Sequence, residues 1–507
     1  MGHIIAGYEY DWAALQFRDL PSLVFGDSVH TYAQIDACAN RLAHALIGLG
    51  LKPGARVAVL LTNSVASLET VIGVAKAGLV FVALNARHAA PEHAAILADC
   101  GAEAVIAGPE FAALAPVLGA HGPLIGIGWG ELRYDDLLAT QPDHPPRLAV
   151  AEDALVRIAY TSGTTGRPKG IAYSFRRLKA RYDNFFAALE YRLGPQDSMI
   201  HVGPLTHAAG NYLLPYYLRG AKNVILPRFD PDLVLRTVEM QRITHLFLVP
   251  TMLIRLLDHL DTGAAYDLSS LSVINYGTAP TPAPVIRRAL DRFGPILRQH
   301  FGMSECPQPL TVLYPHDHLD PARLTSCGRP TLNLRIEVRG PDGATLSTGE
   351  VGEIAIAAQG VADVDYWRRP DLRAEAVKDG WLMTGDLGRF DADGFLYIVG
   401  RNKEMIISGG FNIYAREVED ALFRMPGIAD AAVFGLPDAE WGEVVAAALV
   451  PRPGQTPDLS SLGDTIAGYK KPRRLLTLAE LPRNLAGKVD KGALRALALQ
   501  SMGGETQ

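Results

Sequence analysis

The N-terminal part of the chain alternates between short apolar segments and amphipathic segments, and this alternation constrains the fold more than any other feature. The pattern runs from Ser22 to about Gly108, and Thr31 and Gln34 have the capping-box spacing that predicts a helix from Tyr32. Its strand-like segments are residues 55–61, 79–85 and 102–108, and its helix-like segments are residues 64–78 and 91–101. Alternation of this kind is typical of a parallel β-sheet covered by helices, so we predict an α/β fold.

The same alternation returns in the middle of the chain. Helical periodicity occupies residues 176–193, 232–243 and 285–294, and strand-like segments occupy residues 223–227, 244–250 and 271–277. This pattern predicts a second α/β subdomain, which we expect to end near Phe293.

The sequence changes character again in its last third. Beyond Gly328, short strand-like segments and the turns at residues 341–343 and 392–394 predict a small β subdomain. From about Asn402, a helix-like segment, strand-like segments and a final helix-like segment predict a further unit. This unit is long enough to fold as its own domain.

Charge and hydropathy exclude several classes of function. The net charge is −6 and the pI is about 6.2, and we find no long run of lysine and arginine, so a nucleic-acid partner is not expected. The most apolar region, residues 71–84, is interrupted by Lys76 and is too short for a membrane span. Glu9 and Asp11 precede any long apolar run, unlike the start of a secretory signal.

The cysteines and histidines do not have the spacing of a disulfide framework or a zinc site. The four cysteines are Cys38, Cys100, Cys306 and Cys327. Their scattered positions predict a reduced, cytoplasmic protein. His316 and His318 could hold a metal, but a solvated loop pair is the favoured interpretation.

Residues 160–171, YTSGTTGRPKGI, form a loop rich in glycine, serine and threonine between two strand-like segments. Converging backbone N–H groups, hydroxyls and a lysine suit a polyphosphate. The spacing of Gly163, Gly166 and Lys169 differs from that of the Walker motif, so this would be another kind of phosphate loop. A flexible surface turn is the alternative that composition alone leaves open.

Four further motifs follow this loop in a fixed order. They are FGMSE at residues 301–305, TGD at 384–386, GRNKEMIISGG from residue 400 and PRNLAGKVDK from residue 482. Together with the loop, they resemble the adenylate-forming superfamily of acyl-CoA synthetases, adenylation domains and beetle luciferase. The resemblance implies a large N-terminal domain, residues 1–400, of two α/β subdomains and a small β subdomain. It also implies a hinge at 401–404 and a small, mobile α+β C-terminal domain at 405–507.

The resemblance also implies where ATP and Mg²⁺ would bind. The residues expected to cradle the β- and γ-phosphates are Thr161, Ser162, Gly163, Thr164, Thr165 and Lys169. Glu305 would hold Mg²⁺, and Ser304, which replaces a commoner threonine, would contact the α-phosphate. The residues expected around the adenine are Phe301, Gly302 and Met303 on one side and Gly277, Thr278 and Ala279 on the other. For Phe301, the alternative to an adenine contact is an ordinary core aromatic. Asp386, assisted by Arg401, would bind the ribose hydroxyls.

In the C-terminal domain, the resemblance makes Lys488 the catalytic lysine that bridges the substrate carboxylate and the α-phosphate. Lys491 and Lys470 are the neighbouring lysines for which a surface role is expected instead. Lys403 matches the hinge position. Rotation about it would bring Gly409 and Gly410 to the reaction centre, where side chains would block the path of the pantetheine.

The acid and its acceptor are indicated less directly. His207 resembles the histidine between the acid pocket and the CoA tunnel, with a structural histidine as the alternative, and Trp441 would stack on the CoA adenine. Residues 204–215 contain no aspartate to hold an amine, which favours an acid without an α-amino group. Small residues at 208–210 and an apolar wall of Tyr212, Tyr276 and Met303 would suit an aliphatic or aromatic acid.

We therefore predict an AMP-forming acyl-CoA synthetase that uses ATP, Mg²⁺ and CoA. A stand-alone enzyme that loads a carrier-protein phosphopantetheine is the first alternative, and a catalytically silent nucleotide-binding relative is the second. The expected partner is a small-molecule carboxylic acid, and a homodimer is left open.

Overall fold

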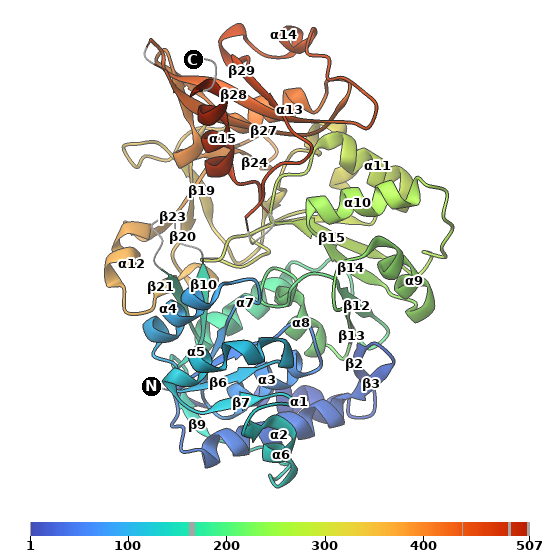
Figure 1. Ribbon diagram of the computed structural model, residues 1–507, viewed down its shortest axis with the longest axis vertical. Coiled ribbons are helices and arrows are strands. Elements are labelled where there is room, and N and C mark those ends of the chain that lie inside the picture. Colours follow the sequence, from blue (N-terminus) through green and yellow to red (C-terminus); the bar gives the residue numbers. More distant parts are fainter. Residues whose placement is uncertain (1, 162–167, 439, 485–487, 504–507) are drawn as a thin grey trace.

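The computed structural model describes residues 2–161, 168–438, 440–484 and 488–503. Across these residues, a large N-terminal domain carries a small C-terminal domain at one end (Figure 1). The large domain contains two mainly parallel sheets and a third, antiparallel sheet, and the C-terminal domain has a sheet of its own. This is the predicted α/β fold.

The first sheet has the strand order β21-β11-β10-β5-β4-β6-β7-β8, and its central strands are parallel as predicted. Its strands are β4 (Arg56–Leu60), β5 (Val80–Ala83), β6 (Ala104–Ala107), β7 (Leu124–Gly126), β8 (Leu132–Arg133), β10 (Leu155–Thr161), β11 (Lys169–Ser174) and β21 (Asp365–Tyr366). Apolar clusters cover both faces of this sheet. A short pair, β1 (His3–Ile5) and β9 (Ala149–Ala151), lies apart from it.

The second sheet has the strand order β18-β17-β16-β15-β14-β12-β13-β2-β3. Its strands are β2 (Pro21–Phe25), β3 (Ser28–Thr31), β12 (Ser198–His201), β13 (Lys222–Ile225), β14 (His245–Leu248), β15 (Val273–Gly277), β16 (Leu297–Phe301), β17 (Thr311–Leu313) and β18 (Arg329–Pro330). Two of our expected boundaries were wrong. The segment from Ser22 joins this sheet through pairing of β2 with β13, and the sheet continues past Phe293. Long-range strand pairing of this kind leaves no local pattern.

The helices connect and cover these sheets. They are α1 (Tyr8–Gln16), α2 (Tyr32–Gly48), α3 (Ala66–Lys76), α4 (Ala90–Cys100), α5 (Ala115–Leu118), α6 (Tyr134–Ala139), α7 (Phe175–Ala187), α8 (Gly210–Tyr217), α9 (Pro231–Gln241), α10 (Pro250–Leu260), α11 (Ala283–Phe293) and α12 (Pro370–Ala376). The capping box of Thr31 and Gln34 is present at the start of α2. The predicted helix at 176–193 ends early, because side chains of Arg298 and Tyr314 donate hydrogen bonds to the Ala188 carbonyl.

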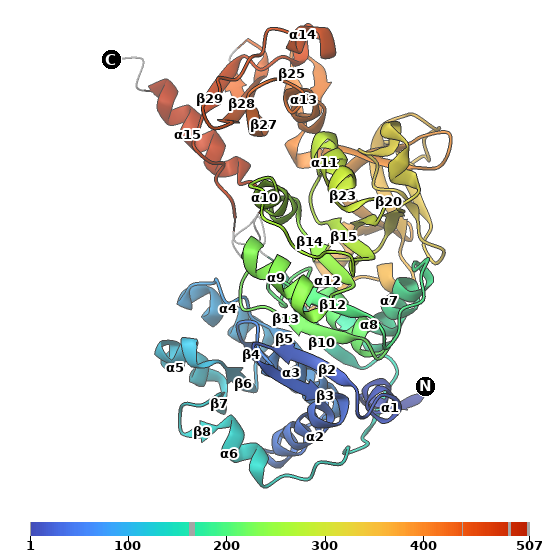
Figure 2. The ribbon, with the colours of Figure 1, turned by 90° about the vertical axis from the view of Figure 1, so that its right-hand side faces the viewer.

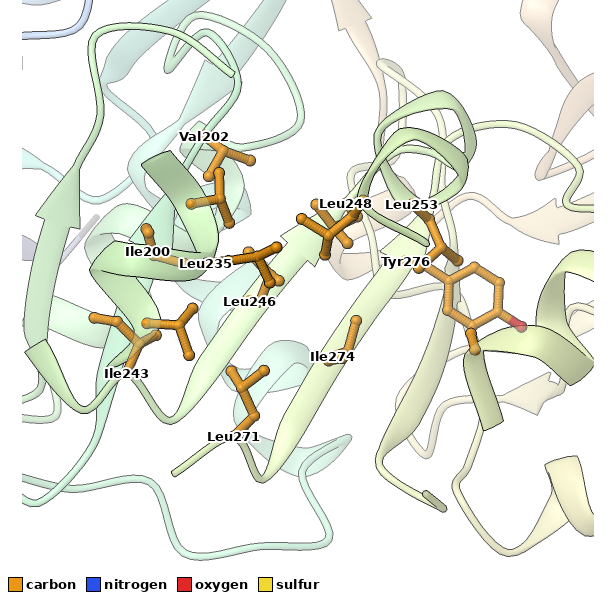
Figure 3. Packing of buried hydrophobic residues seen from close by; sticks show 14 of the residues in the cluster. Ile200, Val202, Leu235, Ile243, Leu246, Leu248, Leu253, Leu271, Ile274 and Tyr276 are labelled. Carbon is orange, nitrogen blue, oxygen red and sulfur yellow. The ribbon is translucent and has the colours of Figure 1, made fainter. Parts of the chain in front are cut away.

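The largest hydrophobic cluster lies under the second sheet. Ile200, Leu246 and Ile274 point from adjacent strands toward Leu235 of α9 and Leu253 of α10 (Figure 3). All of these side chains are fully or almost fully buried. Burial on this scale stabilises the sheet and holds its carboxyl-terminal edge, where the candidate site residues lie, in a defined position.

The third sheet is antiparallel, as its turn-rich sequence predicts, and the sheet of the C-terminal domain is mainly antiparallel, with β28 and β29 paired in parallel. The third sheet contains β19 (Ile336–Arg339), β20 (Gly352–Ala357), β22 (Val377–Lys378), β23 (Trp381–Phe390) and β24 (Leu396–Arg401). The C-terminal domain contains β25 (Ile406–Ser408), β26 (Phe411–Ile413), β27 (Ile428–Asp438), β28 (Gly442–Pro451), β29 (Arg474–Thr477), α13 (Ala415–Leu422), α14 (Leu462–Thr465) and α15 (Lys491–Gly503). Among the described residues, we find no helix with the length and apolar character needed to cross a membrane.

His318 corrects the expectation of a solvated loop pair, because its side chain is almost completely buried. Its Nδ1 lies 2.7 Å from the Tyr314 carbonyl oxygen and its Nε2 lies 2.9 Å from the Tyr276 hydroxyl. Nδ1 donates to the carbonyl oxygen, and Nε2 can accept the hydrogen of the Tyr276 hydroxyl when the ring is neutral. Burial lowers the pKa of His318 to about 4.

This lowered pKa predicts acid sensitivity. Between pH 6.5 and 4, the unfolded chain binds a proton at His318 that the folded chain does not, so stability falls as the pH falls through this window. The expected loss is about 3 kcal/mol by pH 4. Urea unfolding at pH 7.5 and pH 4 would measure it, and His318→Gln should reduce the pH dependence by this amount, while the other buried histidines keep their own contributions. An unchanged pH dependence in that variant would contradict the prediction.

Candidate active site

The predicted phosphate loop joins two strands, as expected. β10 and β11 pair antiparallel, and Thr161 lies opposite Lys169 in their register. The loop residues Ser162, Gly163, Thr164 and Thr165 lie outside the described residues. The two described members of the predicted set thus lie side by side at the mouth of this hairpin.

The segment from Phe301 to Glu305 leaves the carboxyl end of β16 and is held by side chains that the sequence analysis missed. Tyr173 donates to the Ser304 carbonyl, and Arg177 donates to the Glu305 carbonyl. Arg177 is buried and also donates to two other carbonyls, so its guanidinium is fixed on the adjacent α7. No local signal identifies these contacts, because the partners are more than a hundred residues apart.

The Glu305 carboxylate is half-buried and accepts a hydrogen bond of 3.4 Å from the Tyr366 hydroxyl. In the part of the chain that the structure describes, no group of three or more acidic, histidine or cysteine side chains could form an all-protein metal site. Mg²⁺ is commonly held by one or two carboxylates together with substrate phosphates, so a single oriented carboxylate fits this ion.

The expected adenine-binding segments end adjacent strands. Residues 277–279 follow β15, and a Cβ at Gly277 would lie 2.1 Å from the His300 carbonyl oxygen, so only glycine fits there. Thr278 has a φ of 72°, a strained value for a β-branched residue and a feature that is common in ligand-binding sites. Phe301 is 8% exposed and packs with Ile171 and Cys306, so the alternative of a core aromatic also agrees with its surroundings.

Asp386 and Arg401 are register partners on β23 and β24, in the third sheet. The Arg401 Nε donates to Asp386 Oδ1 at 3.0 Å. Asp386 is 6% exposed, and burial raises the pKa of its carboxyl group, while Arg401 and Lys488 act in the opposite direction. The pair therefore presents a buried carboxylate beside two cations that favour its charged form.

Lys488 reaches this carboxylate from the C-terminal domain. Figure 2 shows the start of α15 on the side of the C-terminal domain that faces the large domain. The residue keeps exposed surface, yet protein around its ammonium group lowers the pKa of Lys488, and the nearby Arg401 lowers it further. The carboxylates that oppose this shift are those of Asp386, Glu404 and Glu305. The structure thus brings three separate sequence motifs to one place.

The two neighbouring lysines for which a surface role was expected, Lys491 and Lys470, form ion pairs with glutamates. Lys491 lies 3.0 Å from both Glu404 and Glu419, and Lys470 lies 2.6 Å from Glu417. Among the described residues, no acidic oxygen within 4 Å holds the ammonium group of Lys488 in the same way. Lys488 is therefore the lysine available to a substrate.

The turn formed by Gly409 and Gly410 contacts Trp441, a contact that the sequence analysis did not predict. The two glycines form the exposed turn between β25 and β26, both with positive φ. The Gly409 N–H donates to the Trp441 carbonyl at 2.9 Å, and a Cβ at Gly409 would lie 2.6 Å from the indole ring. Arg473 lies 4.2 Å from the centre of the same ring.

Lys403 is exposed in the short turn Asn402–Glu404.

His207 precedes α8 and is half-buried. Its Nε2 is buried and has no hydrogen-bond partner among the described residues. Burial lowers the pKa of His207, and the positive charge of Arg87 lowers it further, so the ring is neutral at pH 7. The expected apolar wall is only partly present, because Tyr212 and Tyr276 are core residues with bonded hydroxyls and Met303 alone keeps exposed surface.

Comparison with known families decides the identity of the chain. The profile described as "AMP-binding enzyme" matches residues 10–366, and that described as "AMP-binding enzyme C-terminal domain" matches residues 417–488. The chain belongs to the AMP-binding enzyme family. Within it, the chain is an enzyme of the adenylate-forming acyl-CoA ligase group, which uses ATP and CoA.

Individual relatives of this AMP-binding enzyme cover almost its whole length. A feruloyl-CoA synthase of an Amycolatopsis species is 39% identical over 93% of this chain and 94% of its own. The medium/long-chain fatty-acid CoA ligase FadD8 of Mycobacterium tuberculosis is 36% identical over 98% of this chain and 89% of its own. The solved amide bond synthetase McbA of Marinactinospora thermotolerans has a TM-score of 0.87, 31% identity and coverage of 96% and 99%.

Proposed function

We propose that this AMP-binding enzyme converts a carboxylic acid without an α-amino group to its acyl-CoA. The acid would be aliphatic or aromatic. The observation that carries the proposal is the convergence of Lys488, the Asp386–Arg401 pair and Glu305 from two domains. Binding ATP and stabilising the charge that moves at its α-phosphate need a carboxylate for the ribose hydroxyls, a carboxylate for Mg²⁺ and a lysine. Among the described residues, Lys488 has no acidic oxygen within 4 Å.

In the first step, a carboxylate oxygen of the acid attacks the α-phosphorus, an O–P bond forms, and pyrophosphate leaves. Lys488 would bridge the attacking carboxylate and the α-phosphate. Thr161, Lys169 and the loop between them would hold the outgoing phosphates, and Ser304 would contact the α-phosphate. Mg²⁺ held at Glu305 would neutralise phosphate charge. Asp386 would fix the ribose, and the segments at 277–279 and 301–303 would flank the adenine.

In the second step, the thiol sulfur attacks the acyl carbon, a C–S bond forms, and AMP leaves. The Nε2 of neutral His207 has no hydrogen-bond partner among the described residues, and it would accept the thiol proton. We propose domains at 1–400 and 405–507 with a hinge at 401–404, centred on Lys403. Rotation there would exchange Lys488 for Gly409 and Gly410, and Trp441 would then meet the CoA adenine.

The proposed thiol acceptor is CoA. CoA is favoured by the two CoA ligases among the relatives described above. The similarity to an amide bond synthetase and the alternative of a carrier-protein thiol make other acceptors worth testing. All four cysteines are free, which supports the proposed cytoplasmic location.

Mass spectrometry of the products would test the function. With ATP, Mg²⁺, CoA and a panel of short, medium, long and aromatic acids, we expect acyl-CoA and AMP for one group of acids. Acyl adenylate without thioester would favour a carrier-protein acceptor, and no consumption of ATP with any acid would contradict the proposal. Light scattering of the same sample would test for a homodimer.

A further inference from the structure

Helix α8 carries two tyrosines that bond buried histidines of the second sheet in the same way. The Tyr212 hydroxyl lies 2.8 Å from His300 Nδ1 on β16, and the Tyr216 hydroxyl lies 2.9 Å from His245 Nδ1 on β14. All four side chains are at most 2% exposed. The two pairs sit at opposite ends of the sheet, because His245 begins its parallel strand and His300 lies next to the end of its own.

The pairs differ at the second ring nitrogen. The Nε2 of His245 lies 3.9 Å from a carboxylate oxygen of Asp197. The Nε2 of His300 is buried and has no hydrogen-bond partner among the described residues. A buried polar atom without a partner is uncommon in native proteins and calls for a missing water or ligand. The unmatched nitrogen is the one near the candidate active site.

The hydrogen-bond directions show what His300 requires. The Gln308 amide donates to the Tyr212 oxygen at 3.3 Å, so the tyrosine hydrogen is free to be donated to His300 Nδ1. Burial lowers the pKa of His300 well below its ordinary value, so the ring is neutral and carries one proton. Because Nδ1 accepts, that proton is on Nε2. In this arrangement, His300 Nε2 is a donor without a partner among the described residues, and an acceptor would complete it.

His300 is well placed to meet the acid. It immediately precedes Phe301, and its register partner on β15 is Gly277, which puts no side chain beside the imidazole. The ring stacks at 13° on Tyr212, with centroids 6.0 Å apart, and Tyr212 also packs 4.8 Å from Phe247. The surroundings of His300 are thus aromatic, and its Nε2 lies near the carboxyl ends of the strands, where open α/β sheets bind ligands.

We propose that His300 Nε2 donates a hydrogen bond to an oxygen substituent on the ring of an aromatic acid. The enzyme would therefore select hydroxy- or alkoxy-substituted aromatic acids over the same acids without the oxygen. An acid lacking that acceptor leaves the His300 donor unsatisfied, which is costly in a buried site. This inference rests on the proposed function.

Acid-dependent exchange of pyrophosphate into ATP tests the inference. The probes are 4-hydroxycinnamate against cinnamate, 4-methoxycinnamate against cinnamate and 4-hydroxybenzoate against benzoate, with decanoate as an acid that has no ring. For at least one pair, we expect kcat/KM to favour the oxygenated acid by about tenfold or more. In His300→Phe, this preference should fall to about twofold or less, through loss on the oxygenated acid alone.

Two hydroxyl deletions provide a matched comparison. Tyr212→Phe frees the His300 Nδ1, so the tautomer is no longer set and the preference should weaken. Tyr216→Phe removes the equivalent hydroxyl from the pair at the other end of the sheet and should leave the preference unchanged. Retained activity on cinnamate or benzoate shows that a variant is folded, and if His300→Phe does not fold, Tyr212→Phe decides.

Specific outcomes would overturn the inference. They are equal use of both members of every pair by the unaltered enzyme, activity on decanoate alone, or an undiminished preference in His300→Phe or Tyr212→Phe. Absence of exchange with every acid, including a wider panel, would instead contradict the proposed function itself.

Discussion

Replacing Lys488 with alanine should lower the rate of acid-dependent pyrophosphate exchange by about 10²- to 10³-fold. The ammonium group has no acidic oxygen within 4 Å among the described residues and lies near the Asp386–Arg401 pair. It can therefore place its charge where the pentavalent α-phosphate becomes more negative. Transfer of the acyl group from a synthetic acyl adenylate to CoA should be much less affected, because that step follows the adenylation chemistry.

Lys470→Ala is the matched control for this prediction. Lys470 is bound to Glu417 within the C-terminal domain and should tolerate the same truncation with little change in exchange rate. Unchanged turnover in Lys488→Ala would remove this lysine from the mechanism and would revive the alternative of a catalytically silent relative. Equal losses in the two steps would point to a general defect in the folded protein.

Replacing Asp386 with alanine should weaken ATP binding by about 10²-fold, measured by calorimetry without the acid. A buried carboxylate that accepts hydrogen bonds from two ribose hydroxyls loses charge-assisted bonds when it is truncated. The substitution also leaves the guanidinium of Arg401 without its carboxylate partner. The expected loss is in affinity, since the ribose takes no part in bond making.

The nucleotide itself provides the control for Asp386→Ala. 2′,3′-Dideoxy-ATP lacks the two hydroxyls, so it should bind the unaltered enzyme weakly and should bind the variant with little further loss. If the variant lost the same factor for ATP and for the dideoxy nucleotide, the carboxylate would act through Arg401 or through folding. The ribose contact would then be wrong.

Local sequence predicted the elements that local physics stabilises. The strands and helices between residues 55 and 108, the helix opened by Thr31 and Gln34, and the hairpin turn at 392–394 are all present. Each depends on apolar periodicity, capping or turn chemistry over a few residues. The end of α7 was missed because side chains from β16 and the loop after β17 bind the Ala188 carbonyl.

For the site, motif order predicted which residues to examine but not what surrounds them. The paired Lys491 and Lys470, and the packing of Trp441 on Gly409, became visible only in the folded chain. Arg177 and Tyr366 carry no motif that marks them as supports of the segment ending at Glu305. The roles proposed for the motif residues remain predictions for the experiments above.

The sequence by itself determined the α/β class, the order of the subdomains and the family, because these depend on periodic burial and on motifs read along the chain. Only the tertiary structure decided that β2 joins the second sheet, and that the buried Nε2 of His300 has no hydrogen-bond partner among the described residues. These features are set by pairing and packing between residues far apart in sequence. Such contacts depend on the whole core and leave no local signature.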